Sequence, residues 1–485
     1  MNKLIYFLSI FFSLNCFSQE NLLDTTYGLN SGYTNFAFYN GSQPTGGLQI
    51  QSTIKLPDGK ILAVGVRLIA RFTANGVLDQ TFNGVGYKLL SSGNYGQIES
   101  AKDGNFIIVD GSSGGQLQKI DSDGNFVTSF TTFNESGNYG NIFIDNSGKI
   151  YLLIQNNNVF SIARILPNGI LDTSFGINGK ISLNPNYYYG KILLNSNNEI
   201  FIAGKQQISQ TNRNIIVTKI SSNGLIDTTF GTNGSFIYPG GEYVGDASFI
   251  EILDDGKILG LTSGSLCNGN NCFGLIMYRL LPNGVLDTSF KNAGTFVLPI
   301  QSNSTPSELK RHQDGDYIVS GTGLRTMYAI KMDSDANLDS SFGLNGKIIT
   351  PELSASGYPA YNNGFELYGN SIVLAGIYSF WYGAQLRYAG TVRKYFFDAS
   401  SLNTSEIHTQ KNIRIFPNPV KDYINIQIEE SINGFEIYDQ NGRKLISSKM
   451  KLSKNEIDVK SLSPGAYVLR LELTNKNVSI KFLKN

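Results

Sequence analysis

Short runs in which apolar and polar residues alternate, each closed by turn residues, make up most of the chain from residue 49 onward. The first set shows the pattern well: Gln49 to Leu56 alternates, and Pro57-Asp58-Gly59 forms a turn. Further runs follow at Lys60 to Val66, Leu68 to Thr73 and Val77 to Phe82. Alternation with a period of two, interrupted at short intervals by Gly, Pro, Asn and Asp, predicts antiparallel strands joined by hairpins. We therefore expect a unit of four strands.

This unit recurs along the chain. A phrase of the type Gly-Lys-Ile-Leu is found in seven copies, which begin at Gly59, Gly104, Gly148, Asn198, Gly256, Gly315 and Asn370. A second phrase follows most copies: an apolar strand with one basic residue, a turn such as Leu-Pro-Asn-Gly, and then Leu-Asp-Thr-Ser-Phe, as in Arg164 to Phe175 and Arg279 to Phe290. Such a repeat indicates one supersecondary unit per copy.

Seven four-stranded units that bury both faces of each sheet predict an all-β fold, a seven-bladed β-propeller. The alternative is an open β-solenoid, which needs shorter and more regular coils. The seventh unit ends at Gly390 to Phe397 without a following Leu-Asp-Thr-Ser-Phe phrase, whereas Leu23 to Gly28 carries such a phrase before the first unit. We therefore expect the N-terminal segment to supply the outer strand of the last blade, with Asp24 opposite Lys394 and no open sheet edge.

The hairpin register predicts ion pairs. A three-residue Pro-Asn-Gly loop places the basic residue of each third strand opposite the acid eight residues later. The expected pairs are Arg71 with Asp79, Arg164 with Asp172, Lys219 with Asp227, Arg279 with Asp287, and Lys331 with Asp339. In the second copy Lys119 is present but Val127 replaces the acid. Each cross-strand pair contributes about 0.2–1 kcal/mol, so the pairs mainly fix the register.

Two acidic turns resemble part of a calcium loop, Asp121-Ser122-Asp123 and Asp333-Ser334-Asp335. Both occupy the register of the Leu-Pro-Asn-Gly hairpins, and neither has the spaced bidentate Glu of a calcium site. We expect hairpin turns, with no metal and no cofactor.

The first 18 residues have the composition of a secretory signal peptide, with Lys3 before an apolar run from Leu4 to Leu14 and small Ser18 at the cleavage point. A lipoprotein with Cys16 as the anchor is the alternative, although Asn15 stands where a small residue is required. Among later residues, no apolar run reaches the ~18 residues of a membrane helix.

The overall composition disfavours a helical bundle, because the chain has 52 glycines, 26 tyrosines and 30 phenylalanines and only 16% charged residues. A net charge of +1 gives no electrostatic reason to expect nucleic acid or an anionic membrane as partner.

The search for a catalytic site is mostly negative. The two histidines are His312, next to a hairpin, and His408. A catalytic pair of carboxylates, as in glycosidases, remains an open alternative.

Cys267 and Cys272 flank a short insertion and predict a disulfide in an oxidising compartment, with free thiols or a metal as alternatives.

Aromatic clusters suggest a ligand site. Tyr187, Tyr188 and Tyr189 form one cluster, and Trp381 and Tyr382 follow Phe380 in another. We place both in loop connections, where ligand-binding residues of propellers often lie. Packing between blades is the alternative.

The phrase Leu171-Asp172-Thr173-Ser174-Phe175-Gly176-Ile177-Asn178-Gly179, followed by a Gly-Lys-Ile-Leu hairpin, resembles the delta-60 repeat of secreted bacterial β-propeller-like proteins. The resemblance covers roughly Asp24 to Phe397. It implies the fold and export, and it implies no defined activity.

The composition changes after Asp398. Residues 399–411 form a polar linker, and the last segment has seven short alternating strands that predict a small Ig-like β-sandwich. Three motifs in this segment, Phe416-Pro417-Asn418-Pro419, Phe435 to Gly442 and Leu462 to Val468, resemble the type A C-terminal sorting domain of the type IX (Por) secretion system. The resemblance implies passage through the periplasm, recognition by the secretion machinery at the outer membrane, and removal of this domain. An adhesive β-sandwich is the alternative.

The sequence thus predicts a signal peptide at 1–18, a propeller at 19–398, a linker at 399–411 and a sorting domain at 412–485. We expect a secreted or cell-surface protein that binds or adheres without catalysis, to a glycan or protein ligand that the sequence does not identify. The alternative is a glycan-degrading propeller enzyme, a hydrolase or lyase. An enzyme would carry acids and cations at one mouth of the propeller, outside the repeated positions.

Overall fold

The structure is a computed structural model of two compact units, Met1–Asp398 and Ala399–Asn485. The described residues are 22–30, 32–36, 39–40, 43–44, 49–111, 114–209, 212–242, 248–265, 273–298, 300, 304–323, 325–353, 360–382, 385–398, 414–417, 419–428, 431–439, 444–448, 456–463, 465–473 and 477–485.

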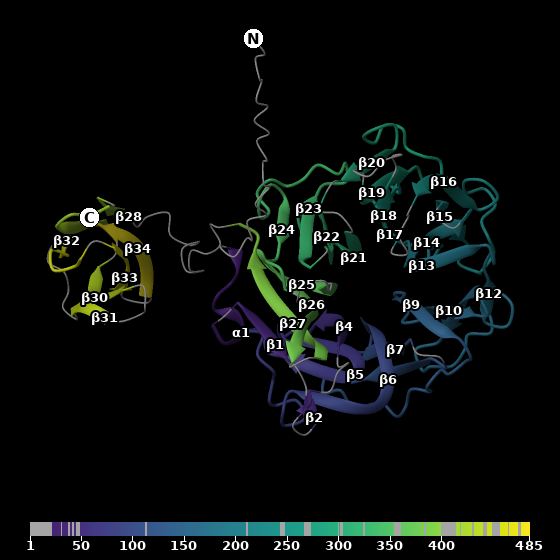
Figure 1. Ribbon diagram of the computed structural model, residues 1–485, viewed down its shortest axis with the longest axis horizontal. Coiled ribbons are helices and arrows are strands. Elements are labelled where there is room, and N and C mark those ends of the chain that lie inside the picture. Colours follow the sequence, from purple (N-terminus) through teal and green to yellow (C-terminus); the bar gives the residue numbers. More distant parts are fainter. Residues whose placement is uncertain are drawn as a thin grey trace, which may run out of the picture. The chain divides into compact units, whose positions relative to one another are not determined.

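Antiparallel four-stranded sheets make up most of the first unit, and Figure 1 shows the sheets following one another around a ring. Three of these sheets are β9 (Asn138–Ile144), β10 (Ile150–Asn156), β11 (Val159–Ile165) and β12 (Lys180–Ser182); β13 (Tyr187–Leu194), β14 (Ile200–Gln207), β15 (Asn212–Ile220) and β16 (Ser235–Glu242); and β17 (Ser248–Ile252), β18 (Ile258–Ser265), β19 (Phe273–Leu280) and β20 (Thr295–Leu298). The next is β21 (Thr305–Arg311), β22 (Tyr317–Thr322), β23 (Met327–Met332) and β24 (Lys347–Ile349). The last is β25 (Tyr361–Tyr368), β26 (Ser371–Tyr382) and β27 (Gln385–Phe396), completed by β1 (Tyr33–Phe36).

A five-stranded sheet contains the first two copies of the repeat. Its strands are β4 (Ile50–Lys55), β5 (Ile61–Phe72), β6 (Tyr87–Ser100), β7 (Phe106–Asp110) and β8 (Gln116–Ile120). The first half of β5 pairs with β4 and its second half pairs with β6. The first half of β6 pairs with β5 and its second half pairs with β7. β5 therefore supplies two strands of the first copy, whereas β6 contributes to both the first and the second copy.

The N-terminal segment joins the last sheet. β1 pairs with β27 from Tyr33 opposite Arg393 to Phe36 opposite Gly390. Leu23 forms a single bridge with Tyr395, and the Asp24 amide donates to the Lys394 carbonyl at 2.9 Å. Figure 1 shows α1 (Tyr27–Asn30) and β1 beside β27, and a small ribbon of β2 (Tyr39–Asn40) and β3 (Gln43–Pro44) follows. The ends of a segment of more than 350 residues are thus tied within one sheet.

The position of the fourth strand differs from the sequence prediction. We expected the Leu-Asp-Thr-Ser-Phe phrase to be the outer strand, but it forms only a one-residue bridge, such as Ile165 with Leu171. The Asp172 carboxylate accepts hydrogen bonds from the Ser174 amide and hydroxyl, which turns the backbone, and Asn178 at φ 51° turns it again. The outer strand comes after these turns, as β12 does here and β1 does at the N-terminus.

The hydrophobic core lies between neighbouring sheets. The Phe of the repeated phrase is buried in each described copy: Phe82, Phe130, Phe175, Phe230, Phe290 and Phe342. Phe230 packs with Phe201 of β14 and Ile276 of β19, which belong to two adjacent sheets. Strands such as β7 are buried at every position because sheets cover both of their faces.

The second unit has two sheets around one core. The first contains β28 (Arg414–Phe416), β29 (Tyr423–Gln427) and β32 (Glu456–Asp458). The second contains β30 (Ile432–Asp439), β31 (Lys444–Ser448), β33 (Gly465–Leu473) and β34 (Asn477–Lys484). Ile424 from the first sheet and Ile437 and Leu469 from the second are fully buried in the same cluster.

Candidate functional site

A cavity of about 680 Å³ lies where the innermost strands of the sheets converge. Its lining comes from β4, β6, β9, β13, β17, β21 and β25, which are the first strands of the successive repeat copies. A cavity of this volume is in the range of small-molecule binding sites. We call it the central cavity.

One register position contributes Glu99, Lys310 and Glu366 to the lining of the central cavity. This is the residue that pairs with the fourth residue of each Gly-Lys-Ile-Leu phrase, and the seven copies have Ile54, Glu99, Phe143, Leu193, Glu251, Lys310 and Glu366 there. Three copies have an apolar residue and four have a charged one. These charges are therefore not part of the repeat, and the structural role of the position does not require them.

The β21–β25 side of the central cavity holds a compact ion cluster. Lys310 Nζ lies 3.1 Å from Glu308 Oε1 and 3.6 Å from Glu366 Oε2. Thr53 Oγ1 donates to Glu366 Oε1 at 3.1 Å, and Glu308 Oε2 accepts the Phe365 amide at 2.9 Å. Burial raises the pKa of Glu366 to about 7, although Lys310 opposes the shift. Burial lowers the pKa of Lys310, but Glu308 and Glu366 outweigh it and raise that pKa to about 12.

Three other ionisable side chains of the inner strands, Glu99, Lys191 and Glu251, do not form such an ion cluster. Lys191 Nζ lies 5.8 Å from the centre of the Phe249 ring. Glu99 accepts a hydrogen bond from Gln97 Nε2 at 3.2 Å, and Glu251 is two residues beyond Phe249 on β17. Burial raises the pKa of Glu99, and it raises that of Glu251 to about 7, with Lys191 opposing both shifts. Within the described residues, no salt bridge is formed by Glu99, Lys191 or Glu251.

Other polar side chains of the cavity hold neighbouring sheets together. Gln97 Oε1 accepts the Ile142 amide at 3.0 Å, and Asn141 Oδ1 accepts the Ile192 amide at 2.9 Å. Ser52 Oγ accepts the Ile98 amide at 3.3 Å in the same manner. The described cavity wall thus combines structural amides with ionisable groups, of which Glu308 and Glu366 also connect neighbouring sheets.

A second set of charges lies in the hairpins. The basic residues and the acids eight residues later are brought together at 2.6 to 3.0 Å: Arg71–Asp79, Arg164–Asp172, Lys219–Asp227, Arg279–Asp287 and Lys331–Asp339. Lys394 lies 3.0 Å from Asp24. In the second copy Lys119 instead contacts Asp103 at 2.9 Å and donates to the Pro167 carbonyl at 2.9 Å.

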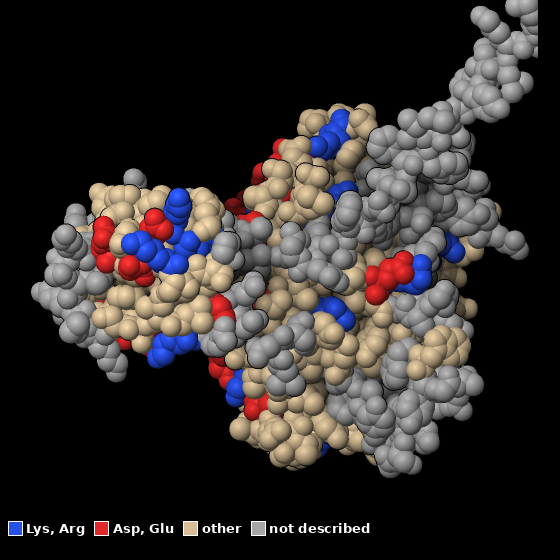
Figure 2. Space-filling view, turned by 60° about the vertical axis from the view of Figure 1, so that its left-hand side comes forward, with Lys and Arg blue, Asp and Glu red and all other residues tan. Residues whose placement is uncertain are grey.

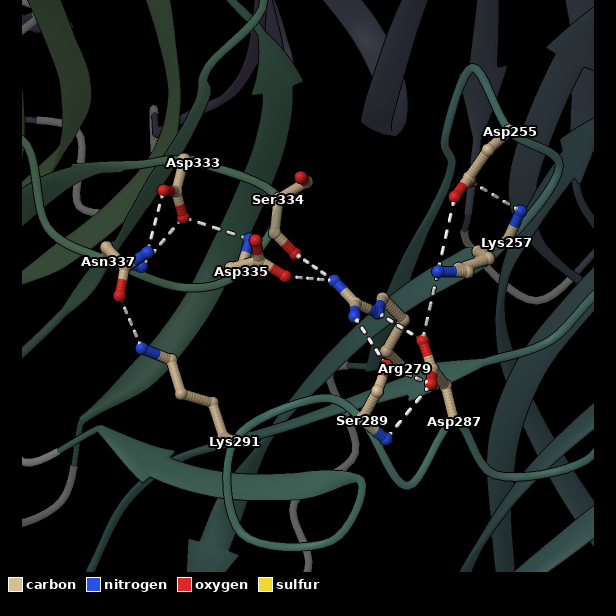
Figure 3. Close-up of polar contacts among 10 residues, drawn as sticks. All are labelled: Asp255, Lys257, Arg279, Asp287, Ser289, Lys291, Asp333, Ser334, Asp335 and Asn337. Atoms are coloured by element: carbon tan, nitrogen blue, oxygen red, sulfur yellow. Dashed lines mark hydrogen bonds and ion pairs between the residues drawn. The ribbon is translucent and has the colours of Figure 1, made fainter.

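The arginines of this set also connect neighbouring sheets, which the sequence analysis missed. In Figure 3, Arg279 Nε donates to Asp287 at 2.8 Å while Nη1 reaches the Ser334 carbonyl at 3.2 Å and the Asp335 carboxylate. Ser334 and Asp335 belong to the hairpin of the next copy. Arg71 makes the same contacts with the Ser122 carbonyl and Asp123. Some copies have Arg at this position where others have Lys, and a guanidinium has five N–H donors. This difference between the copies could have indicated the connecting role from the sequence.

The two acidic turns are hairpin loops. Asp121 Oδ1 accepts the amides of Asp123 and Asn125, and Asp333 Oδ1 accepts those of Asp335 and Asn337. In the part of the chain that is described, no group of three or more His, Cys, Asp or Glu is arranged to hold a metal ion.

The aromatic clusters do not form one site. Tyr187 and Tyr189 are buried on β13 and pack in the core, with Tyr189 at 5.8 Å from the Phe160 ring, because alternate residues of a strand face the same side. Placing both aromatic clusters in loops was wrong, because Trp381 and Tyr382 lie on β26. Tyr188 and Trp381 are exposed, whereas the side chain of Tyr382 and the predicted disulfide between Cys267 and Cys272 lie outside the described residues.

Surface charge gives no further site on the face seen in Figure 2. Lys, Arg, Asp and Glu form small groups of mixed sign there on a mostly uncharged surface. Among the described residues, no helix has the length and apolar character that a membrane span needs.

Two family models match the chain. The secretion system C-terminal sorting domain matches residues 414–485, and the domain of unknown function (DUF5122) beta-propeller matches residues 56–82, 148–175 and 253–290. The chain thus contains segments of a DUF5122 β-propeller domain and a C-terminal sorting domain. The delta-60 repeat predicted from the sequence is this propeller family. The sorting domain indicates export by the type IX secretion system, whose machinery it contacts, to the cell surface or the extracellular space.

Solved structures with a similar fold are distant. A virginiamycin B lyase from Staphylococcus aureus has 13% identity and a TM-score of 0.43, over 74% of this chain and 99% of that chain. The Dos1 propeller has 9% identity and a TM-score of 0.40, over 75% and 81%. Extracellular domains 1-2 of Drosophila Semaphorin 1a have 7% identity and a TM-score of 0.41, over 75% and 88%. No curated protein matches the chain significantly. These similarities say nothing about a ligand.

Proposed function

We propose that this protein is a secreted or cell-surface seven-bladed propeller that binds a small polar ligand in the central cavity without transforming it. The blade count rests on five four-stranded sheets plus the five-stranded sheet, in which β5 supplies two strands of the first copy and β6 serves two copies. The mature chain begins at Gln19, the linker spans 399–411, and the Ig-like sorting unit at 412–485 is removed on export.

The observation that supports binding is the contrast between the two sets of charges. The hairpin charges recur along the chain and form close ion pairs. Glu99 of the central cavity stands at a position where other copies have Ile54, Phe143 or Leu193, and within the described residues it forms no salt bridge. Burying an ionisable group without an ion partner is costly, so such a group is expected where a ligand is recognised.

A glycan-degrading activity is the second candidate. The pKa values of Glu251 and Glu366 are raised to about 7 by burial, as in a general acid at neutral pH. Glu366 is held by Thr53 and lies near Lys310, which favours a fixed structural role for it. Glu251 is the residue on which an acid–base mechanism would depend.

The test uses the mature full-length chain on a glycan array, with two matched variants. Gly96 lines the cavity, and a Cβ atom added to it would contact only Gln51 Oε1, at 3.5 Å, so Gly96→Phe should fill the cavity without displacing the backbone. Ile177→Phe, at an 83% exposed position, is the control. We expect binding that Gly96→Phe abolishes and Ile177→Phe retains. New reducing ends or unsaturated products that disappear in Glu251→Gln would establish the enzyme instead.

A further inference from the structure

We propose that the central cavity selects an uncharged carbohydrate, whose hydroxyl groups donate to the Glu99 carboxylate and accept from the Lys191 ammonium. The inference rests on the proposed binding function and names the chemistry of the ligand. It follows from the balance of charges in the described lining, from the two charged groups that keep hydrogen-bonding capacity there, and from the neutral groups beside them.

The described lining carries equal numbers of acidic and basic side chains. The carboxylates are Glu99, Glu308 and Glu366, and the ammonium groups are Lys55, Lys191 and Lys310. A ligand with a net charge of either sign would bring an uncompensated charge into this wall, which costs free energy. The balance therefore favours a ligand without a net charge.

Most of these charged groups are already engaged by the protein. Lys310 Nζ lies 3.1 Å from Glu308 Oε1 and 3.6 Å from Glu366 Oε2. Lys55 Nζ donates to the Leu367 carbonyl at 2.5 Å, at an exposed position. These contacts hold the four side chains in place and leave them less available to a ligand.

Glu99 and Lys191 keep hydrogen-bonding capacity for a ligand. Gln97 Nε2 donates to Glu99 Oε1 at 3.2 Å, and within the described residues the second carboxylate oxygen has no hydrogen bond. Lys191 Nζ lies 5.8 Å from the centre of the Phe249 ring, and it forms no ion pair with a described residue. Lys191 opposes the rise that burial causes in the pKa of Glu99, so the two charges act on the same region of the cavity.

Hydroxyl groups suit such a pair of side chains. A hydroxyl donates through its hydrogen and accepts through its oxygen, so neighbouring hydroxyls of one sugar ring can bond to a carboxylate and to an ammonium. Hydrogen bonds with an ionised partner are roughly twice as strong as those between neutral groups, and here they add no net charge. Gln51 and Ser307 in the same lining offer a neutral amide and a hydroxyl, and Phe249 offers an apolar surface for the C–H groups of a sugar.

Isothermal titration of the mature chain tests the inference with matched probes. Trimers of glucose, galactose and mannose are each used in three forms that differ only at C6, which carries a hydroxyl, a carboxylate or an ammonium. The titrations are made at pH 8, because burial raises the pKa of Glu366 to about 7 and its carboxylate is then ionised. An aliphatic ammonium also keeps its charge at about pH 8.

We expect the neutral form of at least one trimer to bind at least about tenfold more tightly than both of its charged forms. Glycylglycine is a further probe, since this zwitterion also has no net charge but carries no hydroxyl groups. It should bind more weakly than that neutral trimer.

Variants should shift the charge preference in opposite directions. Glu99→Gln and Lys191→Met should each weaken binding of the neutral trimer at least about fivefold. Glu99→Gln should also shift the preference toward the carboxylate form, and Lys191→Met toward the ammonium form, because each leaves the opposite charge in excess. The double variant restores the balance, so it should bind weakly and prefer the neutral form again.

Control variants and thermal unfolding separate these effects from misfolding. Lys102→Met and Glu352→Gln, both at exposed positions outside the cavity, should leave the affinity and the charge preference unchanged. Salt gives an independent readout, because it screens attraction between charges. The affinity of the unaltered chain for the neutral trimer should change less than about twofold between about 50 mM and about 500 mM NaCl, whereas a charged form bound by either single variant should be bound more weakly at the higher concentration.

The outcomes separate the two proposals. Binding of a charged form or of glycylglycine that is at least as tight as that of every neutral trimer, and that is lost in Gly96→Phe, would refute the selection of an uncharged carbohydrate and leave ligand binding in the cavity intact. An unchanged charge preference in both single variants, or no binding by any neutral trimer, would also overturn it. If none of the probes binds and Gly96→Phe changes nothing on the glycan array, both proposals are wrong.

Discussion

Substitution of Asp172 by Asn tests whether the hairpin ion pairs stabilise the propeller. The Asp172 carboxylate lies 2.8 Å from Arg164 Nε and 3.1 Å from Lys149 Nζ, and it accepts the Ser174 amide and hydroxyl at 3.2 and 2.6 Å. Its side chain is only 8% exposed. The amide of Asn has the same shape but lacks the charge, and it leaves the Arg164 guanidinium without its carboxylate.

The expected magnitude follows from the pKa of Asp172. Burial would raise this pKa, but the hydrogen bonds from Ser174 and the charges of Lys149 and Arg164 outweigh it and hold the pKa at about 2, against an ordinary 3.8. At about 1.4 kcal/mol per pH unit, the difference corresponds to roughly 2.5 kcal/mol. The buried Arg164 adds to this loss, so we expect Asp172→Asn to lower the free energy of unfolding by about 3 kcal/mol at pH 7.

The direction of the pKa shift determines how the contribution of Asp172 to stability depends on pH. Because the carboxyl pKa is lower in the folded state, Asp172 stabilises the fold above pH about 4, and the contribution disappears as the pH falls toward 2. Urea unfolding followed by fluorescence measures it, since the chain has a single tryptophan, Trp381, which lies on β26 in the first unit. Asp58→Asn is the control: its pair with Lys60 is exposed, so its loss should destabilise the fold far less than the loss of Asp172. A loss below about 0.5 kcal/mol for Asp172→Asn at pH 7, or an undiminished loss at pH 2.5, would refute the reasoning.

Three further predictions address the architecture. Phe290→Ala should lower the free energy of unfolding by about 3–5 kcal/mol, because the ring is fully buried between sheets. Ile177→Ala, at an exposed position, should change it by less than about 0.5 kcal/mol, and urea unfolding of both variants measures the difference. Removal of residues 19–36 should cost roughly 2–4 kcal/mol and increase amide exchange along β27, whose partner β1 is then missing; unchanged exchange would contradict a closed ring. Removal of residues 412–485 should leave a folded propeller inside the periplasm, detected by cell fractionation, and its normal appearance in the medium would contradict the sorting role.

The regular elements could be predicted because they are repeated. The alternation of apolar and polar residues and the turn residues predicted the first three strands of a copy. Because one phrase occurs seven times, copies with an irregular pattern could also be identified. The fourth strand was misplaced because the apolar residues of Leu171 to Phe175 alternate as in a strand. Only the hydrogen bonds of the Asp172 side chain and the positive φ of Asn178 show that the chain turns there first.

The central cavity could not be predicted in this way. Its charges come from β4, β6, β13, β21 and β25, so residues more than 250 positions apart meet only after the sheets have formed a ring. The sequence analysis assigned most acids to repeated positions, which holds for Asp172 and Asp287 but not for Glu99 or Glu251. Comparison of the copies at one position, where Ile54 corresponds to Glu99, would have revealed the difference.

Repetition also explains why stability and recognition depend on different residues. Each arginine of the hairpin set connects one sheet to the next, so the loss of Arg279 weakens one junction while Arg71 and Arg164 still hold theirs. Energies of distant junctions add nearly independently. The cavity has no such redundancy, because Lys191 and Glu99 each occur once and both line the same space. If the cavity binds a ligand as proposed, a chain with this repeat can change that ligand by substitutions at a few inner-strand positions, while the hairpin pairs continue to maintain the ring.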